Sequence, residues 1–154
     1  YTRTARNKTP VLYDGREDEI AIGKGIILKE GNDVAIIACG VMVSEALKAA
    51  DELEQKGIAA TVVDMHTIKP LDDKLVHSLA QKCGAIVTAE DHNIIGGLGG
   101  AVAEYLSSNI PIILERVGVN DRFGESGQAD EMLELMEISA PYIAKSAIRA
   151  INRK

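Results

Sequence analysis

Residues 85–100 read AIVTAEDHNIIGGLGG and carry the strongest indication of fold class in this sequence. The apolar run at 85–89 is typical of a buried strand, and the glycine cluster at 96–100 predicts a turn with little side-chain bulk. Apolar residues then recur at helical spacing, which predicts an amphipathic helix that packs back on the sheet. Those helix positions are Leu98, Ala101, Val102, Tyr105 and Leu106. The stretch therefore predicts a strand–turn–helix unit.

The same alternation of strand and helix patterns runs through most of the chain. A fully buried strand is predicted at 34–39, further strands at 58–65 and 111–117, and a short strand at 26–28. Strands that are apolar on both faces are typical of parallel sheets covered by helices. Alternating strands and helices of this length predict right-handed βαβ units. We expect an α/β fold with three layers, in which a doubly wound, mostly parallel sheet has about five strands.

Capping residues predict where several of the helices begin. Ser44 can cap a helix that runs to Lys56, and Asp72 can cap the short helix that follows the next strand. A short helix is expected at 129–136, and Ser139 followed by an early proline opens the last one.

Composition excludes several classes of partner. The 154 residues are 46% hydrophobic and 26% charged, as in an ordinary soluble domain, and the net charge is −6. An acidic surface attracts neither nucleic acid nor an anionic membrane. Cys39 and Cys83 have no close-spaced partners, which favours buried, reduced thiols and a cytoplasmic location. No apolar stretch approaches the length of a membrane span.

The glycine cluster at 96–100 resembles a dinucleotide fingerprint only in part. In the G-x-G-x-x-G pattern that starts at Gly97, Val102 stands in place of the third glycine, and the cluster follows a late strand. We therefore favour a backbone that passes close to another surface, either its own sheet or a partner subunit. A module that binds a nucleotide or another anion at this cluster remains the alternative.

Two other motifs fall short of a catalytic site. Residues 124–127 resemble a nucleophile elbow, but Gln128 replaces the second glycine and no strand precedes the segment. Glu90, Asp91 and His92 are adjacent and point in different directions, so they cannot converge on one metal ion. Their position at the carboxyl end of a parallel strand is nevertheless where α/β sites form.

The N-terminal segment differs from the rest of the chain. Residues 1–15 are polar, carry Arg3, Arg6 and Lys8, and resemble a linker or arm that leads into an edge strand. Arginine is the usual planar fork for phosphate, but the sequence pattern alone favours solubilising charges. The chain opens on Tyr1, so we expect a processed chain or a piece of a longer one.

The order and spacing of several motifs resemble the C-terminal domain of transketolases over nearly the whole chain. The most recognisable are VVDMHTIKPLD at 62–72 and TAEDH at 88–92 with the following glycines, and TRTAR at 2–6 resembles the end of the family's pyrimidine-binding module. The resemblance implies that residues 1–15 end that module and that 16–154 form the C-terminal domain. Related third domains occur in deoxyxylulose-phosphate synthase and in 2-oxo acid dehydrogenase beta subunits, which remain alternatives.

The resemblance also implies an activity for the complete enzyme. Transketolases use thiamine diphosphate and Mg²⁺ to transfer a two-carbon ketol unit between sugar phosphates, and the modules that hold both are absent from this chain. We therefore expect no catalytic, cofactor-binding or metal-binding residue here, and an inactive chain when it is alone. Its expected partners are the catalytic modules, on the same or another subunit, in a homodimer. One residue carries over, Arg3, which the resemblance assigns to the phosphate of the sugar substrate.

Overall fold

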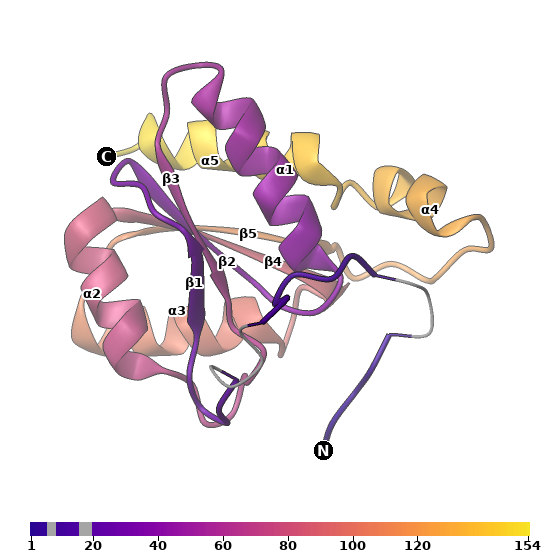
Figure 1. The fold of residues 1–154 in the computed structure, drawn as a ribbon, viewed down its shortest axis with the longest axis horizontal. Helices are drawn as coiled ribbons and strands as arrows, with labels where there is room; N and C mark the ends of the chain where they lie inside the picture. Colours follow the sequence, from indigo (N-terminus) through magenta and orange to yellow (C-terminus); the bar gives the residue numbers. More distant parts are fainter. Residues whose placement is uncertain (6–8, 16–19) are drawn as a thin grey trace.

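The computed structural model describes residues 1–5, 9–15 and 20–154, which form a three-layer α/β domain (Figure 1). Its central sheet has the strand order β1-β3-β2-β4-β5. The strands are β1 (Ile26–Lys29), β2 (Val34–Ala38), β3 (Ala60–Asp64), β4 (Ala85–Asn93) and β5 (Ile113–Val119). All neighbouring pairs are parallel except β1 and β3, which are antiparallel. The predicted fold class is confirmed.

Helices cover both faces of the sheet, and each face has its own apolar core. One core joins the sheet to α1 (Met42–Glu54) and α5 (Ala140–Ile151), and the other joins it to α2 (Asp73–Cys83) and α3 (Leu98–Asn109). The fully buried β2 serves both, because Ile36 faces the first core and Ile37 the second. The apolar runs of β2, β3 and the first part of β4 are therefore strands buried on both sides, whereas the edge strand β5 is only partly buried.

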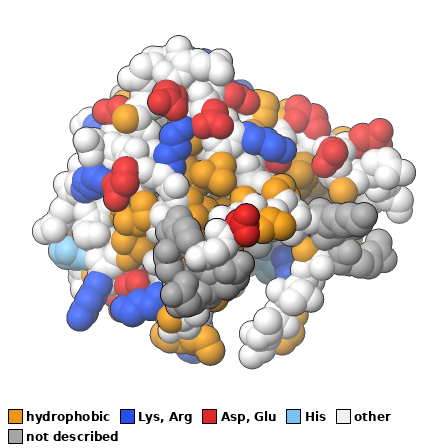
Figure 2. Space-filling model, viewed as in Figure 1, with side chains coloured by type: hydrophobic (Ala, Val, Ile, Leu, Met, Phe, Trp, Pro, Cys, Tyr) orange, Lys and Arg blue, Asp and Glu red, His pale blue; other side chains and the backbone are white. Residues whose placement is uncertain are grey.

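Helix α4 (Ala129–Leu135) lies outside these layers (Figure 1). None of its residues is buried. Figure 2 shows acidic and basic side chains interspersed over the visible face rather than gathered into a single basic patch. Among the described residues, no helix combines the length and apolarity needed to cross a bilayer.

The structure corrects two details of the expected elements. The segment 9–13 forms no strand, so the arm does not lead directly into the edge strand, which is β1. Ser44 does not cap α1, because the helix already begins at Met42 and the Ser44 hydroxyl donates to the Val41 carbonyl at 2.9 Å. The predicted cap of α2 is confirmed, since Asp72 Oδ1 accepts from Leu75 N at 3.2 Å.

Candidate functional site at the carboxyl edge of the sheet

A bulge in β4 separates the three polar residues that the sequence places side by side. Ala89 pairs with Val117 and Asn93 with Val119, so residues 90–92 lie opposite Gly118 alone. A Cβ atom on Gly118 would lie 3.2 Å from the His92 carbonyl oxygen, so glycine leaves room for the bulge. Bulges bend a strand and change the direction of its side chains. Here the bulge turns Glu90 inward, while Asp91 and His92 are exposed.

Glu90 holds the start of α3. Its side chain is buried, with 1% of the residue exposed, and its carboxylate accepts from Leu98 N and Gly99 N, each at 2.8 Å. These amides belong to the first turn of the helix, where N–H groups lack helical partners and the helix dipole favours a negative charge. Glu90 therefore acts as a helix cap supplied from a neighbouring strand.

The glycine cluster is explained by this close approach of helix and sheet. A Cβ atom on Gly97 would lie 1.8 Å from Glu90 Oε2, and one on Gly99 would lie 2.9 Å from Thr88 Oγ1. The sequence analysis allowed a close approach either to the chain's own sheet or to a partner subunit. At Gly97 and Gly99 the neighbouring surface is the chain's own sheet.

The geometry disfavours an anion site at the same cluster. A cavity of about 390 Å³ lies beside it, lined in part by Gly97, Gly100 and Lys69. However, the Leu98 and Gly99 amides are already bonded to Glu90, and the lining also contains the acidic residues Asp73 and Glu104. Carboxylates repel a second anion.

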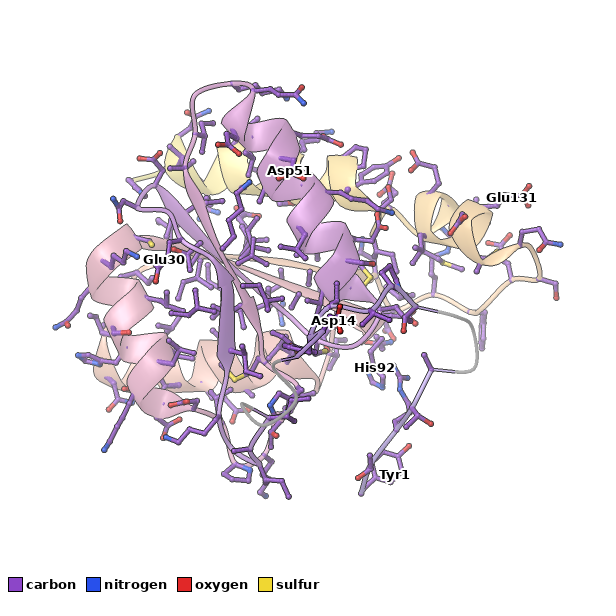
Figure 3. The ribbon with its side chains drawn as sticks, viewed as in Figure 1. Tyr1, Asp14, Glu30, Asp51, His92 and Glu131 are labelled. Atoms are coloured by element: carbon purple, nitrogen blue, oxygen red, sulfur yellow. The ribbon has the colours of Figure 1, made fainter. Side chains whose placement is uncertain are left out.

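Asp91 and His92 meet the N-terminal arm at the exposed end of β4. Arg3 Nη2 donates to the Asp91 carbonyl oxygen at 2.9 Å, a contact between residues 88 positions apart. The His92 ring is oriented by a 3.0 Å contact between Nδ1 and the Asn93 carbonyl oxygen. Figure 3 shows His92 beside the arm that begins at Tyr1. The structure thus brings Arg3 to the strand end that carries Glu90, Asp91 and His92.

A second contact holds the arm against the end of β3. The Tyr13 hydroxyl donates to Asp64 Oδ2, and a cavity of about 310 Å³ lies between the arm and the start of α1. Burial raises the pKa of Asp64, against the opposing effects of the Tyr13 hydrogen bond and of His66. Asp64 Oδ1 is buried without a hydrogen-bond partner among the described residues. No local pattern in the sequence indicates this contact.

Cys39 also lies at this edge, directly after β2, and its environment makes the thiol unreactive. Burial raises the pKa of Cys39 to about 12, and the negative charges of Glu90 and Asp64 add to the effect. The thiolate is the nucleophilic form, so a raised pKa disfavours covalent chemistry. Both cysteines are free thiols; Cys83 is buried as predicted, whereas Cys39 is only partly buried.

The described residues do not fit a diphosphate cofactor with its metal ion. They contain no group of three His, Cys, Asp or Glu side chains that could hold a metal. The amides at the start of α3, which could have faced a diphosphate, are bonded to Glu90.

Ser126, the serine of the motif that resembles a nucleophile elbow, lies in an exposed loop and not on a strand-to-helix turn. In the same loop, Arg122 pairs with Glu125. Among the described residues, Arg3 and His92 are exposed at the carboxyl edge of the sheet, together with Asp91.

The fold and this edge define an α/β domain whose described residues assemble neither a metal site nor a diphosphate site. The family model "Transketolase, C-terminal domain" matches residues 23–143. The chain therefore belongs to the family of transketolase C-terminal domains, as its sequence motifs indicated.

Curated relatives match the full length of the chain. It is 47% identical to a 6-deoxy-6-sulfo-D-fructose transketolase subunit from Clostridium sp. (strain MSTE9) and 44% identical to a putative transketolase C-terminal section from Methanocaldococcus jannaschii. Both matches cover 100% of this chain and 48% of the relative, so the chain spans about half the length of these relatives. A 1-deoxy-D-xylulose-5-phosphate synthase from Rippkaea orientalis is 40% identical over 91% of the chain and 22% of its own length.

Solved structures share the fold. A structure described as "Split gene transketolase, inactive beta4 tetramer" matches with a TM-score of 0.89 and 44% identity. The match covers 96% of this chain and 47% of the other chain. A transketolase from Pichia stipitis matches with a TM-score of 0.72 and 26% identity, over 96% of this chain and 21% of its own.

Proposed function

We propose that this chain is the C-terminal part of a split transketolase subunit. The complete enzyme would transfer a two-carbon ketol unit between sugar phosphates, with thiamine diphosphate and Mg²⁺ held by modules outside this chain. The single observation that carries the proposal is the match over the whole of this chain to a transketolase subunit and to a putative transketolase C-terminal section, at 47% and 44% identity. Deoxyxylulose-phosphate synthase remains the second candidate because relatives of that name match at up to 44% identity.

The role proposed for the domain itself is assembly. Residues 1–15 would end the pyrimidine-binding module, and residues 16–154 would dock against the catalytic modules of the same protein or a partner subunit in a cytoplasmic homodimer. The Tyr13 and Arg3 contacts support this role, because they fix the arm to two strand ends of the domain. The chain alone would be inactive, since its described residues do not fit the cofactor's metal ion.

Arg3 is proposed to bind the phosphate of the sugar substrate. One of its nitrogens donates to the Asp91 carbonyl, and a guanidinium has five N–H donors, so donors remain for an anion. The side chain is exposed at the carboxyl edge, where α/β folds place their ligands. The contact with Asp91 would keep the guanidinium in place before substrate arrives.

The experiment measures the complete enzyme, assembled from the longer subunit and its catalytic partner. Arg3→Ala is expected to raise the KM for a phosphorylated ketose about tenfold or more, with cofactor affinity unchanged. Arg6→Ala serves as the comparison, because Arg6 is the neighbouring arginine of the same motif and lies outside the described residues.

The outcomes separate the parts of the proposal. An unchanged KM in Arg3→Ala with a raised KM in Arg6→Ala would move the phosphate contact to Arg6. Formation of 1-deoxy-D-xylulose 5-phosphate without ketol transfer between sugars would favour the synthase instead. Full activity of residues 1–154 alone would contradict the assembly role.

A further inference from the structure

The Arg3 contact places a guanidinium against the backbone that carries His92. The oxygen that accepts from Arg3 Nη2 belongs to the peptide bond between Asp91 and His92. The Arg3 guanidinium is therefore held at the peptide group that precedes His92, at the end of β4, although Arg3 and His92 are far apart in the sequence. Figure 3 shows His92 on the side of the domain where the arm passes.

The bulge gives His92 a position without a packing role. Its neighbour Glu90 is buried and caps α3, whereas His92 is exposed and its ring contacts the carbonyl of the next residue. That contact at 3.0 Å orients the ring through Nδ1 and leaves Nε2 without a hydrogen-bond partner among the described residues. Bulges are common next to active sites, where they change the direction of a side chain.

We propose that His92 is a second contact, beside Arg3, for the terminal anionic group of the ketose substrate. The inference rests on the proposed function, in which Arg3 binds that group. A phosphate or a sulfonate presents three oxygens, so a guanidinium and a histidine ring N–H can donate to different oxygens of one group. Relatives of this chain are named for both kinds of sugar, a 6-deoxy-6-sulfo-D-fructose and an apulose 4-phosphate.

Of the acidic residues near this contact, Asp121 and Glu90 are engaged in hydrogen bonds, whereas the exposed Asp91 carboxylate repels an anion, and the donors of Arg3 and His92 must outweigh it. The Asp91 carboxylate adjoins His92 in the sequence, and Asp121 accepts from the Asn93 side-chain amide at 2.8 Å. Glu90 is fully engaged with two backbone amides. Arg3 and His92 together supply the N–H donors that an anion requires at this edge.

The test uses the complete enzyme with three probes: D-fructose 6-phosphate, 6-deoxy-6-sulfo-D-fructose and D-fructose. His92→Ala is expected to raise the KM for one or both anionic probes about tenfold, with kcat and the KM for fructose changed less than about twofold. His92→Gln, which keeps a side-chain N–H donor, is expected to recover part of the loss. Whether the phosphate or the sulfonate probe shows the larger change identifies the anion that the site takes.

The controls separate this inference from the proposed function. Arg3→Ala is measured in parallel, and His77→Gln on α2 is the matched histidine variant away from the edge. If Arg3→Ala raises the KM for the anionic probes and His92→Ala does not, the inference is overturned while the proposed function stands. If neither variant changes the KM for the anionic probes, both the Arg3 contact and the His92 contact are overturned. An equal rise for fructose in His92→Ala would also overturn the inference, since a contact to the anion cannot affect a sugar that lacks one.

Discussion

The β4–α3 junction, residues 90–99, and the N-terminal arm meet at one edge of the sheet but are held in different ways. The junction is closed by its own bonds, because Glu90 satisfies the amides of Leu98 and Gly99 inside the domain. The arm is fixed by side-chain contacts from Arg3 and Tyr13 to two strand ends. The glycine-rich motif that most resembles a ligand site is thus structural, and the polar segment that resembles a linker carries the exposed cation. Resemblance to a binding motif is a weak guide unless the donors are free.

The largest effect is expected where the junction has no space. In Gly97→Ala the new Cβ would lie 1.8 Å from Glu90 Oε2, so the buried carboxylate must withdraw from both amides. We expect a loss of about 3 kcal/mol or more in the free energy of unfolding, measured by urea denaturation. Gly100→Ala is the matched control, because among the described residues no atom from beyond its own stretch of helix would lie within 4 Å of the new Cβ, and alanine favours the helix. Equal stability of the two variants would show that the Glu90 bonds do not close the junction.

A smaller loss is expected when the cap keeps its shape but loses its charge and one of its two acceptor oxygens. Glu90→Gln keeps the shape of the side chain but places an NH₂ group against one of the two amides. We expect a loss of about 2 kcal/mol, measured in the same denaturation experiment. Glu104→Gln, at an exposed position on α3, should change stability by less than about 0.5 kcal/mol. A comparable loss of stability in both variants would assign the effect to the removal of a negative charge near α3 rather than to the loss of the cap.

The contrast between junction and arm also explains which features the sequence could predict. Periodic apolar runs predicted the five-strand sheet and its helices. The Asp72 cap could be predicted because the residue that it caps, Leu75, is only three positions away in the sequence. The Glu90 cap was missed because donor and acceptor are eight residues apart across a bulge that Gly118 permits from another strand. The contact between Tyr13 and Asp64 spans 51 residues, and local patterns cannot report it. Arg3 was selected by a family motif, and its anchor at Asp91 emerged only in three dimensions.

Two buried acids, Glu115 and Asp64, affect the stability of the fold with opposite pH dependence. Burial raises the pKa of Glu115 in β5, but hydrogen bonds and charge from Arg149 and Arg153 outweigh it, and the net pKa lies below the ordinary 4.5. The stability that Glu115 contributes is therefore present above about pH 4.5 and is lost as the pH falls through the lowered value. The pKa of Asp64 beside the arm is raised above 3.8, so its ionisation costs stability as the pH rises through that range.

Glu115→Gln and Asp64→Asn are expected to differ in sign. At pH 7 Glu115→Gln should lose about 1 kcal/mol, a modest value because both arginines are half exposed. Asp64→Asn, which keeps an acceptor for Tyr13, should be neutral or slightly stabilising at pH 7. Unfolding free energies measured between pH 3 and 7 should therefore give opposite slopes relative to the parent chain. Parallel slopes would contradict the assignment of Glu115 as paired and Asp64 as desolvated.

The smallest effect on stability is expected at the residue proposed to matter most for function. Arg3 is exposed and donates one described hydrogen bond to a backbone carbonyl, so Arg3→Ala should change the unfolding free energy of the chain by less than about 0.5 kcal/mol. Hydrogen exchange at Asp91 and His92 gives the sharper measurement, since the loss of Arg3 should change protection only near the end of β4. A global loss of stability, comparable to that of Glu90→Gln, would mean that Arg3 is a structural clamp. A purely local change leaves the guanidinium free for the anion of a substrate, because a side chain that does not stabilise the fold can be exposed for another purpose.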